Sequence, residues 1–414
     1  MTDRSRLRID ATRLLDRIDA LAQIGPIDGS GCCRLALTDD DRRGRDQVLE
    51  WMRAGGLEVS VDAIGNMFGY RAGTTDLPPV MTGSHIDTVR TGGRYDGILG
   101  VLAGLEVVST LNDAGLLTRR PIVVAVFTNE EGARFAPDML GSLVYAGGMT
   151  LAQALDVRAI DGARLGDELQ RIGYAGAAPI GVHRPGAFVE LHIEQGPVLD
   201  IERLVIGAVQ DLQGISWQEL TITGQSNHAG TTPMRLRHDA GYAAGAVTTF
   251  VRQLAREFGG SQVATVGNIS LFPNLINVIA AQARLTVDLR NTDESLLQTA
   301  EARLLAFLDQ LARDEGVSIT TRSLARFEPV VFDAGMVERI ERVAGKLGFS
   351  QRRMTSGAGH DAQILARICP SAMIFVPSIK GISHNPAENT LPGDLAAGAN
   401  VLLHTLLELT DLES

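Results

Sequence analysis

Residues 80–97 read Val-Met-Thr-Gly-Ser-His-Ile-Asp-Thr-Val-Arg-Thr-Gly-Gly-Arg-Tyr-Asp-Gly, and the rest of the chain is organised around this stretch. Its short apolar run ends in Thr82-Gly83-Ser84, after which come His85, Asp87 and, beyond two glycines, Asp96. An imidazole followed two residues later by a carboxylate suits a metal ligand with its orienting partner, because the carboxylate can accept the ring N–H that does not face the metal. The alternative is that His85 and Asp87 merely decorate a turn.

The composition is typical of a soluble globular protein, with 45% hydrophobic and 21% charged residues. A chain of 414 residues is too long for one ordinary core, so two domains are expected. The net charge of −11 argues against nucleic acid or an anionic membrane as a partner. No signal peptide or membrane-spanning stretch is evident, and the three cysteines cannot form a disulfide framework. These features together predict a cytoplasmic protein.

Strand-like and helical patterns alternate over the first half of the chain, which predicts an α/β domain with a mostly parallel sheet. One of the expected helices lies near residues 138–156. After residue 212 the pattern changes to a β-α-β-β-α-β order, typical of a self-sufficient α+β unit, and the α/β style returns near the C-terminus. The sequence thus predicts a discontinuous catalytic domain over residues 1–212 and 330–414, with an inserted domain over residues 213–329.

Four strand-like runs of the α/β pattern lead to side chains that can bind a metal ion. These side chains are His85 with Asp96, Glu130 with Glu131, His192, and His384. In an open parallel sheet, ligands gather outside the carboxyl ends of the strands, so the four groups are expected to converge. Histidines and carboxylates without thiolates suit a borderline metal in an open site, above all zinc.

Glu130 and Glu131 are adjacent, and successive side chains of an extended chain face opposite ways. One glutamate can therefore bind metal while the other remains free to handle a proton. Metal-assisted hydrolysis needs that division of labour. The alternative is a solvated acidic pair at a strand end.

Six motifs extend this pattern over essentially the whole chain. They are GSHIDT at 83–88, GGRYDG at 92–97, NEEG at 129–132, ELHIEQGP at 190–197, NHAGTTPM at 227–234 and SHNPAE at 383–388. On these motifs the sequence resembles the M20-type dizinc amidohydrolases, and within them the hydantoinase/carbamoylase branch. That branch holds N-carbamoyl-L-amino acid hydrolases, allantoate amidohydrolases and β-ureidopropionases, and the HIEQGP and HAGTTPM strings are specific to it.

The resemblance implies two divalent metal ions per subunit, zinc first, with manganese, cobalt or nickel as alternatives. His85 and His384 would hold one ion, Glu131 and His192 the other, and Asp96 would bridge them. In the same comparison, Glu130 would be the general base and Asp87 the orienting partner of His85.

The resemblance also implies a homodimer that pairs through the inserted domain, which would serve as a lid. His228 would reach the neighbouring subunit's site. Substrate contacts would come from Gln195, Asn277 and Arg290, and the partner would be a small ureido acid.

Two of these residues have a physical case of their own. Arg290 closes an apolar strand, where a guanidinium needs an anion. A substrate carboxylate could supply it, and so could a structural salt bridge with Asp288 or Asp293. His228 lies in a polar, tightly turned loop and could donate to a developing oxyanion, although an exposed loop histidine would look the same.

The expected activity is hydrolysis of an N-carbamoyl-L-amino acid to the amino acid, carbon dioxide and ammonia. Allantoate amidohydrolase is the first alternative and β-ureidopropionase the second. From a different class, the chain could be a non-catalytic ligand-binding protein on the same scaffold.

Overall fold

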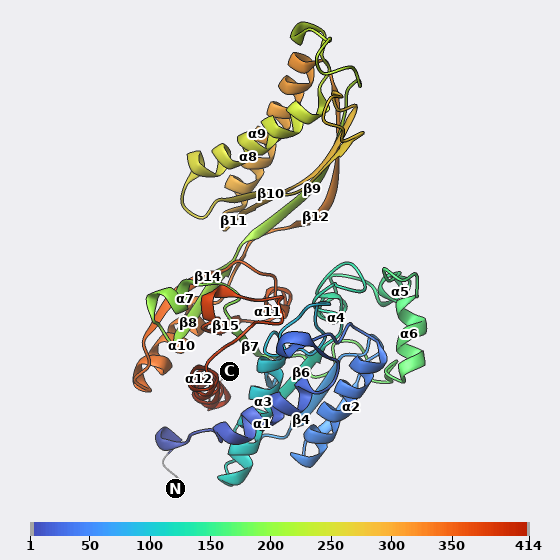
Figure 1. The fold of residues 1–414 in the computed structure, drawn as a ribbon. Coiled ribbons are helices and arrows are strands. Elements are labelled where there is room, and N and C mark those ends of the chain that lie inside the picture. Colours follow the sequence, from blue (N-terminus) through green and yellow to red (C-terminus); the bar gives the residue numbers. More distant parts are fainter. Residues whose placement is uncertain (1–3, 412–414) are drawn as a thin grey trace. The chain divides into compact units, whose positions relative to one another are not determined.

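The computed structural model describes residues 4–411, and residues 1–3 and 412–414 of the predicted catalytic domain lie outside the described residues. The chain divides into two compact units. The large unit is formed by Met1–Gln210 with Phe332–Ser414, and the inserted unit by Asp211–Val331. Figure 1 shows both units, with many of their elements labelled.

A nine-stranded sheet underlies the large unit, in the order β13-β8-β15-β7-β5-β6-β4-β3 with β14 paired to β8. Its strands are β3 (Glu58–Val61), β4 (Met67–Arg71), β5 (Val80–His85), β6 (Ile122–Phe127), β7 (Ala187–Ile193), β8 (Ile206–Leu212), β13 (Val330–Val331), β14 (Gln351–Ser356) and β15 (Ser371–Val376). A separate pair joins β1 (Pro26–Ile27) to β2 (Gly31–Cys32).

The predicted α/β class is confirmed, and the parallel pairing lies in the middle of the sheet. Strands β15, β7, β5 and β6 are parallel neighbours, whereas β4 pairs antiparallel with β6 and β8 with β15. Every residue of the four central strands is buried. Strands of a parallel sheet that is covered on both faces read as nearly continuous apolar runs, which is the pattern that β6 and β15 show.

Helices cover this sheet. They are α1 (Ala11–Ala22), α2 (Asp39–Ala54), α3 (Ile98–Asp113), α4 (Leu140–Tyr145), α5 (Leu151–Leu155), α6 (Leu165–Ile172), α7 (Val198–Glu202), α10 (Ala334–Lys346), α11 (Asp361–Leu365) and α12 (Pro392–Asp411). Short 3₁₀ turns lie at Arg4–Arg6, Asp28–Ser30, Met234–Leu236 and Ile379–Gly381. Helix α3 is buried almost all round, because it packs on β5 and also contacts α1 and α12.

The single helix predicted near 138–156 is wrong: α4 and α5 are separate. Gly147 follows α4 with a φ of 79°, a left-handed conformation that glycine adopts without the steric cost of a Cβ. Thr150 then caps α5 through a reciprocal hydrogen-bond pair with Gln153. Of the described helices, none combines the length and the hydrophobicity required to cross a bilayer.

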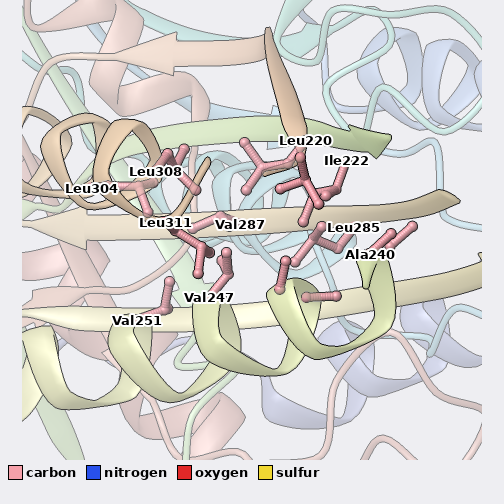
Figure 2. Close-up of a cluster of buried hydrophobic side chains, with 14 of the residues drawn as sticks. Leu220, Ile222, Ala240, Val247, Val251, Leu285, Val287, Leu304, Leu308 and Leu311 are labelled. Carbon is pink, nitrogen blue, oxygen red and sulfur yellow. The ribbon is translucent and has the colours of Figure 1, made fainter. Parts of the chain in front are cut away.

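The inserted unit has the predicted β-α-β-β-α-β order. Its elements are β9 (Gly214–Thr223), α8 (Ala240–Phe258), β10 (Val263–Phe272), β11 (Gln282–Asn291), α9 (Glu294–Glu315) and β12 (Ser318–Phe327). The strands form an antiparallel sheet in the order β10-β11-β9-β12, and α8 and α9 lie side by side on it (Figure 1). Leucine and valine side chains from both helices and from β9 and β11 fill the space between, as Figure 2 shows. This core belongs to the unit alone, so the insertion can fold around its own hydrophobic contacts.

Candidate active site

The parallel strands of the large unit deliver the predicted side chains to one edge of the sheet. His85 is the last residue of β5, and His192 is the last but one of β7. Glu130 and Glu131 follow β6 after two residues, and His384 lies in the loop after β15. Asp96 precedes α3, separated from it by Gly97. The convergence expected from strand order is therefore present.

Asp96 is the common member of two groups of closely spaced ligand atoms. Its Oδ1 lies 3.2 Å from His192 Nε2 and 3.7 Å from His85 Nε2, and its Oδ2 lies 3.3 Å from His384 Nε2. Glu131 Oε2 is also 3.3 Å from His384 Nε2. Within each group, the ligand atoms all lie within 4.8 Å of one another. A carboxylate with one oxygen in each group has the geometry of a bridge between two cations.

The spacing of the other candidate ligands differs from the implied pairing. The structure groups His85 with His192 and groups Glu131 with His384, with Asp96 in both. The reason lies in the strand order: β5 and β7 are adjacent, so their terminal histidines reach the same side of Asp96. The alternative that His85 decorates a surface turn is also excluded, because its side chain is 1% exposed.

Asp87 orients His85, but not through its carboxylate. The backbone carbonyl of Asp87 lies 2.9 Å from His85 Nδ1, whereas the nearest carboxylate oxygen is 3.9 Å away. The carboxylate instead accepts the backbone N–H groups of Glu130 at 3.3 Å and Glu131 at 3.4 Å. Asp87 thus connects the loop after β5 to Glu130 and Glu131 through hydrogen bonds.

Gly97 is required by the ring of His85. Its φ is 68°, and a Cβ on this residue would lie 2.3 Å from His85 Nε2. Its N–H points at His192 Nε2 at 3.0 Å, while His192 Nδ1 lies 2.9 Å from the carbonyl of Ile193. The Ile193 carbonyl therefore fixes a proton on Nδ1, and Nε2 faces Asp96 as the nitrogen that can bind a metal ion once its own proton has left.

The adjacent glutamates face different partners. Glu130 Oε2 lies 3.3 Å from His85 Nε2, and Glu131 pairs with His384. Burial and the nearby charges of Asp361 and Glu131 raise the pKa of Glu130 well above its usual range. A bound cation would favour the ionised form of this carboxyl. The alternative of a solvated acidic pair does not hold, since Glu130 is buried.

The histidines respond differently to their surroundings. Burial lowers the pKa of His85 to about 4. Burial also opposes protonation of His192, but its hydrogen bond and charge interaction with Asp96 outweigh burial and raise its pKa to about 9. Hydrogen bonds with Asp96 and Glu131 raise the pKa of His384 to about 11. Without a cation, protons on these rings offset the charge of the carboxylates.

The residues present fit a pair of divalent ions. Asp87, Asp96, Glu130 and Glu131 crowd together, and burial raises the pKa of Asp87 to about 8. Like charges in a buried cluster require compensation, and nitrogen and oxygen ligands without thiolates are what zinc and related ions accept in open sites. A third group, Glu190, His192 and His360, is fully buried. Its outer members are already engaged, Glu190 by the Ser84 hydroxyl at 2.6 Å and His360 by Ser356 at 3.1 Å.

Gln195 contacts the centre directly. Its Nε2 donates to Asp96 Oδ2 at 2.8 Å, and its φ is 57°, an uncommon conformation for a residue with a side chain. Its Oε1 is buried and, among the described residues, has no hydrogen-bond partner. A buried amide oxygen without a donor is costly, and a ligand N–H would satisfy it.

Sequence reasoning missed two residues beside Asp96. Glu388 Oε1 accepts the backbone N–H groups of Tyr95 at 3.0 Å and Asp96 at 3.3 Å, and the Ser383 hydroxyl donates to Glu388 Oε2 at 2.9 Å. Burial raises the pKa of Glu388 to about 7, with the charge of Asp96 adding to it. The only sequence signal was their place in the SHNPAE motif at 383–388, next to His384.

The inserted unit carries the remaining predicted residues. His228 is exposed, and its Nδ1 accepts the backbone N–H groups of Gly230 at 3.0 Å and Thr231 at 3.2 Å. The Nε2 of a neutral His228 therefore carries the proton and can donate. The carbonyl of Asn277 accepts the N–H of Ala229 at 2.9 Å, which ties the loop of Asn277 to that of His228.

Arg290 makes the salt bridge that the sequence left open as an alternative. Its Nη2 lies 2.9 Å from Asp288 Oδ2, and its guanidinium lies 5.8 Å from the ring centre of Trp217. The Asp288 side chain is 30% exposed and that of Arg290 is 22% exposed. A substrate carboxylate would therefore have to share Arg290 with Asp288.

The fold and the centre together define the class of α/β metallohydrolases. Within it, the chain belongs to peptidase family M20/M25/M40, whose family model matches residues 81–408. The chain is 43% identical over 406 residues to an N-carbamoyl-L-amino-acid amidohydrolase of Rhizobium meliloti, with 98% of both chains covered. It is 34% identical to a ureidoglycolate hydrolase of Arabidopsis thaliana, with 98% of this chain and 88% of that protein covered.

A solved structure extends the likeness to the fold. A hydantoinase/carbamoylase family amidase from Burkholderia multivorans superposes with a TM-score of 0.95 at 45% identity, covering 99% of this chain and 100% of that one. The resemblance predicted from the motifs, to the M20 family and its hydantoinase/carbamoylase branch, is confirmed.

Proposed function

We propose that the protein hydrolyses N-carbamoyl-L-amino acids to the L-amino acid, carbon dioxide and ammonia, using two divalent metal ions per subunit. The observation that carries the proposal is that the adjacent glutamates face different histidines. Glu131 lies 3.3 Å from His384 Nε2, and Glu130 lies 3.3 Å from His85 Nε2. The named activity of the Rhizobium meliloti relative supports the substrate class.

The metal ligands in this proposal are the two groups that share Asp96. His85 and His192 would complete one site, and Glu131 and His384 the other, with zinc as the first candidate. When bound, such ions polarise the carbonyl of a ureido group and lower the pKa of water.

Glu130 is the proton carrier of the proposed reaction. As a carboxylate it takes a proton from the attacking water, and as an acid it returns that proton to the leaving nitrogen. His228 is proposed to donate its Nε2–H to the oxygen that becomes negative, and to do so in the partner subunit's site of a homodimer. Removing one such donor costs on the order of 10²–10³ in rate.

The substrate carboxylate is assigned to Arg290, with Asn277 and Gln195 as further contacts. A planar guanidinium suits a carboxylate, and holding the substrate at both ends makes the attack effectively unimolecular. The role of the inserted unit as lid and dimerisation element belongs to the same proposal.

A paired substitution tests the assignment. Glu130→Gln should bind metal as the wild-type protein does and lose about 10²–10⁴ in kcat, whereas Glu131→Gln should lose metal as well as activity. Metal content after dialysis and ammonia release from a panel of N-carbamoyl-L-amino acids are the two measurements. If Glu130→Gln kept its activity, the proposal would be wrong.

Ureidoglycolate is the second candidate substrate, because a relative with that named activity covers 98% of this chain. It shares the ureido group and carboxylate with N-carbamoyl amino acids, so the same centre could serve both. Ureidoglycolate and allantoate therefore belong in the panel, and the substrate with the highest kcat/KM decides between them.

A further inference from the structure

Glu388 joins the two loops that carry Asp96 and His384. Its carboxylate is buried, with the residue 5% exposed. One oxygen accepts the backbone N–H groups of Tyr95 and Asp96, and the other accepts the hydroxyl of Ser383, the residue before His384. The Glu388 carboxylate thus connects the loop of Asp96 to the loop of His384, and these two residues are candidate metal ligands.

The 92–97 loop is shaped to receive this carboxylate. A Cβ on Gly93 would lie 2.1 Å from Glu388 Oε1, so any larger residue there would displace the glutamate. A second tie runs parallel to the first, since the Thr91 hydroxyl donates to the carbonyl of His384 at 3.3 Å. The two loops therefore interlock through contacts that leave the metal-binding side-chain atoms of Asp96 and His384 free.

We propose that Glu388 is a positioning residue for the metal centre, which fixes the separation of Asp96 and His384 and thereby sets the cation affinity of the group Asp96, Glu131 and His384. This inference rests on the proposed function only in taking Asp96 and His384 as metal ligands. Substitution of residues that orient metal ligands typically costs 10–100-fold in metal affinity.

Loss of Glu388 should weaken cation binding mainly at the group of Asp96, Glu131 and His384. The histidines of the other group, His85 and His192, are held by hydrogen bonds of their own. His85 is held by the backbone carbonyl of Asp87 at 2.9 Å. His192 is held by the carbonyl of Ile193, also at 2.9 Å. Both histidines lie near the ends of buried strands, whereas the His384 side chain is 51% exposed and lies on a loop. Loss of Glu388 therefore frees His384 far more than it frees the other two histidines.

The test is a titration of the metal-free protein with Co²⁺ alone, followed by its visible absorption and by calorimetry. Wild-type protein should bind two ions. Glu388→Ala should weaken one of them by about 10–100-fold and leave the other within about threefold. Ser383→Ala, which removes one end of the tie at little risk to folding, should weaken the same ion by about tenfold. Glu388→Gln keeps an acceptor for the two N–H groups and should restore most of the affinity.

Gly93→Ala provides an independent arm, because it leaves every acid in place and only displaces the carboxylate. It should reproduce the loss seen in Glu388→Ala. Its matched control is Gly393→Ala, where a Cβ would meet nothing within 4 Å. The control for losing a buried carboxylate is Glu106→Ala, which removes the acceptor of the Asp10 N–H and of Arg13, away from every candidate ligand.

Both controls should bind Co²⁺ as the wild-type protein does. Equal weakening of both ions in Glu388→Ala, or an unchanged titration in Ser383→Ala and Gly93→Ala, would overturn the positioning role while leaving the proposed function intact. A wild-type protein that binds no Co²⁺ would overturn the ligand assignment, and the positioning role with it.

Discussion

The backbone carbonyl of Asp87, not its carboxylate, faces His85 Nδ1, at 2.9 Å. The carboxylate is turned toward the N–H groups of Glu130 and Glu131. Asp87 therefore supports the glutamate pair with its side chain and the histidine with its main chain. A substitution of the side chain separates these two functions, because the carbonyl remains.

We expect Asp87→Ala to lower kcat more than it lowers metal affinity. The substitution leaves two buried N–H groups without an acceptor, at about 1–3 kcal/mol, and loosens the backbone that aims Glu130. The orientation of His85 should persist. Steady-state kinetics at saturating metal and a Co²⁺ titration make the comparison. A variant that lost cobalt affinity and retained kcat would show that the carboxylate orients the histidine after all.

Metal affinity should rise with pH through the neutral range. In the metal-free protein the pKa of His192 is about 9 and that of His384 is about 11. At pH 7 both rings are therefore protonated on both nitrogens and carry a positive charge. A cation must displace these protons, since it needs the Nε2 lone pair, and each proton released adds roughly tenfold in affinity per pH unit. Calorimetry in two buffers of different ionisation enthalpy measures the protons released. Affinity independent of pH between 6 and 8 would contradict the assignment.

The same shifts give the metal-free protein a pH-dependent stability. Both histidines have folded-state pKa values above the ordinary 6.5, so their stabilising contribution is fully present below pH 6.5. It is lost as the pH rises through about 9 for His192 and about 11 for His384. The unfolding midpoint of the metal-free protein should therefore fall on the alkaline side, and saturating metal should remove much of that fall.

Gln195 should favour a ureido substrate over an N-formyl analogue. Its Oε1 is buried without a partner among the described residues, while its Nε2 is fixed on Asp96. The NH₂ of a carbamoyl group can donate to that oxygen, and a formyl group cannot. Gln195→Met should therefore reduce the preference, measured as a ratio of kcat/KM values, by roughly 10–100-fold. The N-formyl and N-carbamoyl forms of one amino acid are the matched pair, and an unchanged ratio would exclude this contact.

The site was predictable from sequence where strand ends carry it. Strand-like runs in the sequence identify β5, β6, β7 and β15. The rule that ligands gather at the carboxyl ends of parallel strands then predicts that His85, His192 and Asp96 lie close together. What could not be predicted is which histidine faces which oxygen of Asp96. That depends on the order of strands in the sheet, with β5 beside β7, and no local pattern encodes it.

Contacts made by backbone groups could not be predicted from the sequence either. The orienting carbonyl of Asp87 and the N–H groups held by Glu388 belong to the main chain, which every residue has, so residue type gives no signal for them. The break between α4 and α5 follows from a left-handed Gly147 that the helical spacing of apolar residues conceals. By contrast, the β-α-β-β-α-β order of the inserted unit followed from periodicity alone, because its two helices each bury a single face.

Arg45 and Asp41 form a fully buried ion pair on α2, with Arg45 Nε 2.8 Å from Asp41 Oδ2. Asp41 also accepts the N–H of Leu37 at 2.7 Å. Asp41→Ala would leave the guanidinium buried and uncompensated, so it should lower the free energy of unfolding by about 3–5 kcal/mol. Denaturant titration followed by circular dichroism gives that free energy.

The matched control is Asp156→Ala, which breaks a pair of the same 2.8 Å length whose Asp156 side chain is 75% exposed. Its unfolding midpoint should not move, because solvent and salt screen an exposed pair. Replacing Asp41 by Leu together with Arg45 by Met should recover stability relative to Asp41→Ala, since apolar side chains need no charge partner. Equal losses in Asp41→Ala and Asp156→Ala would mean that burial does not decide the strength of these pairs.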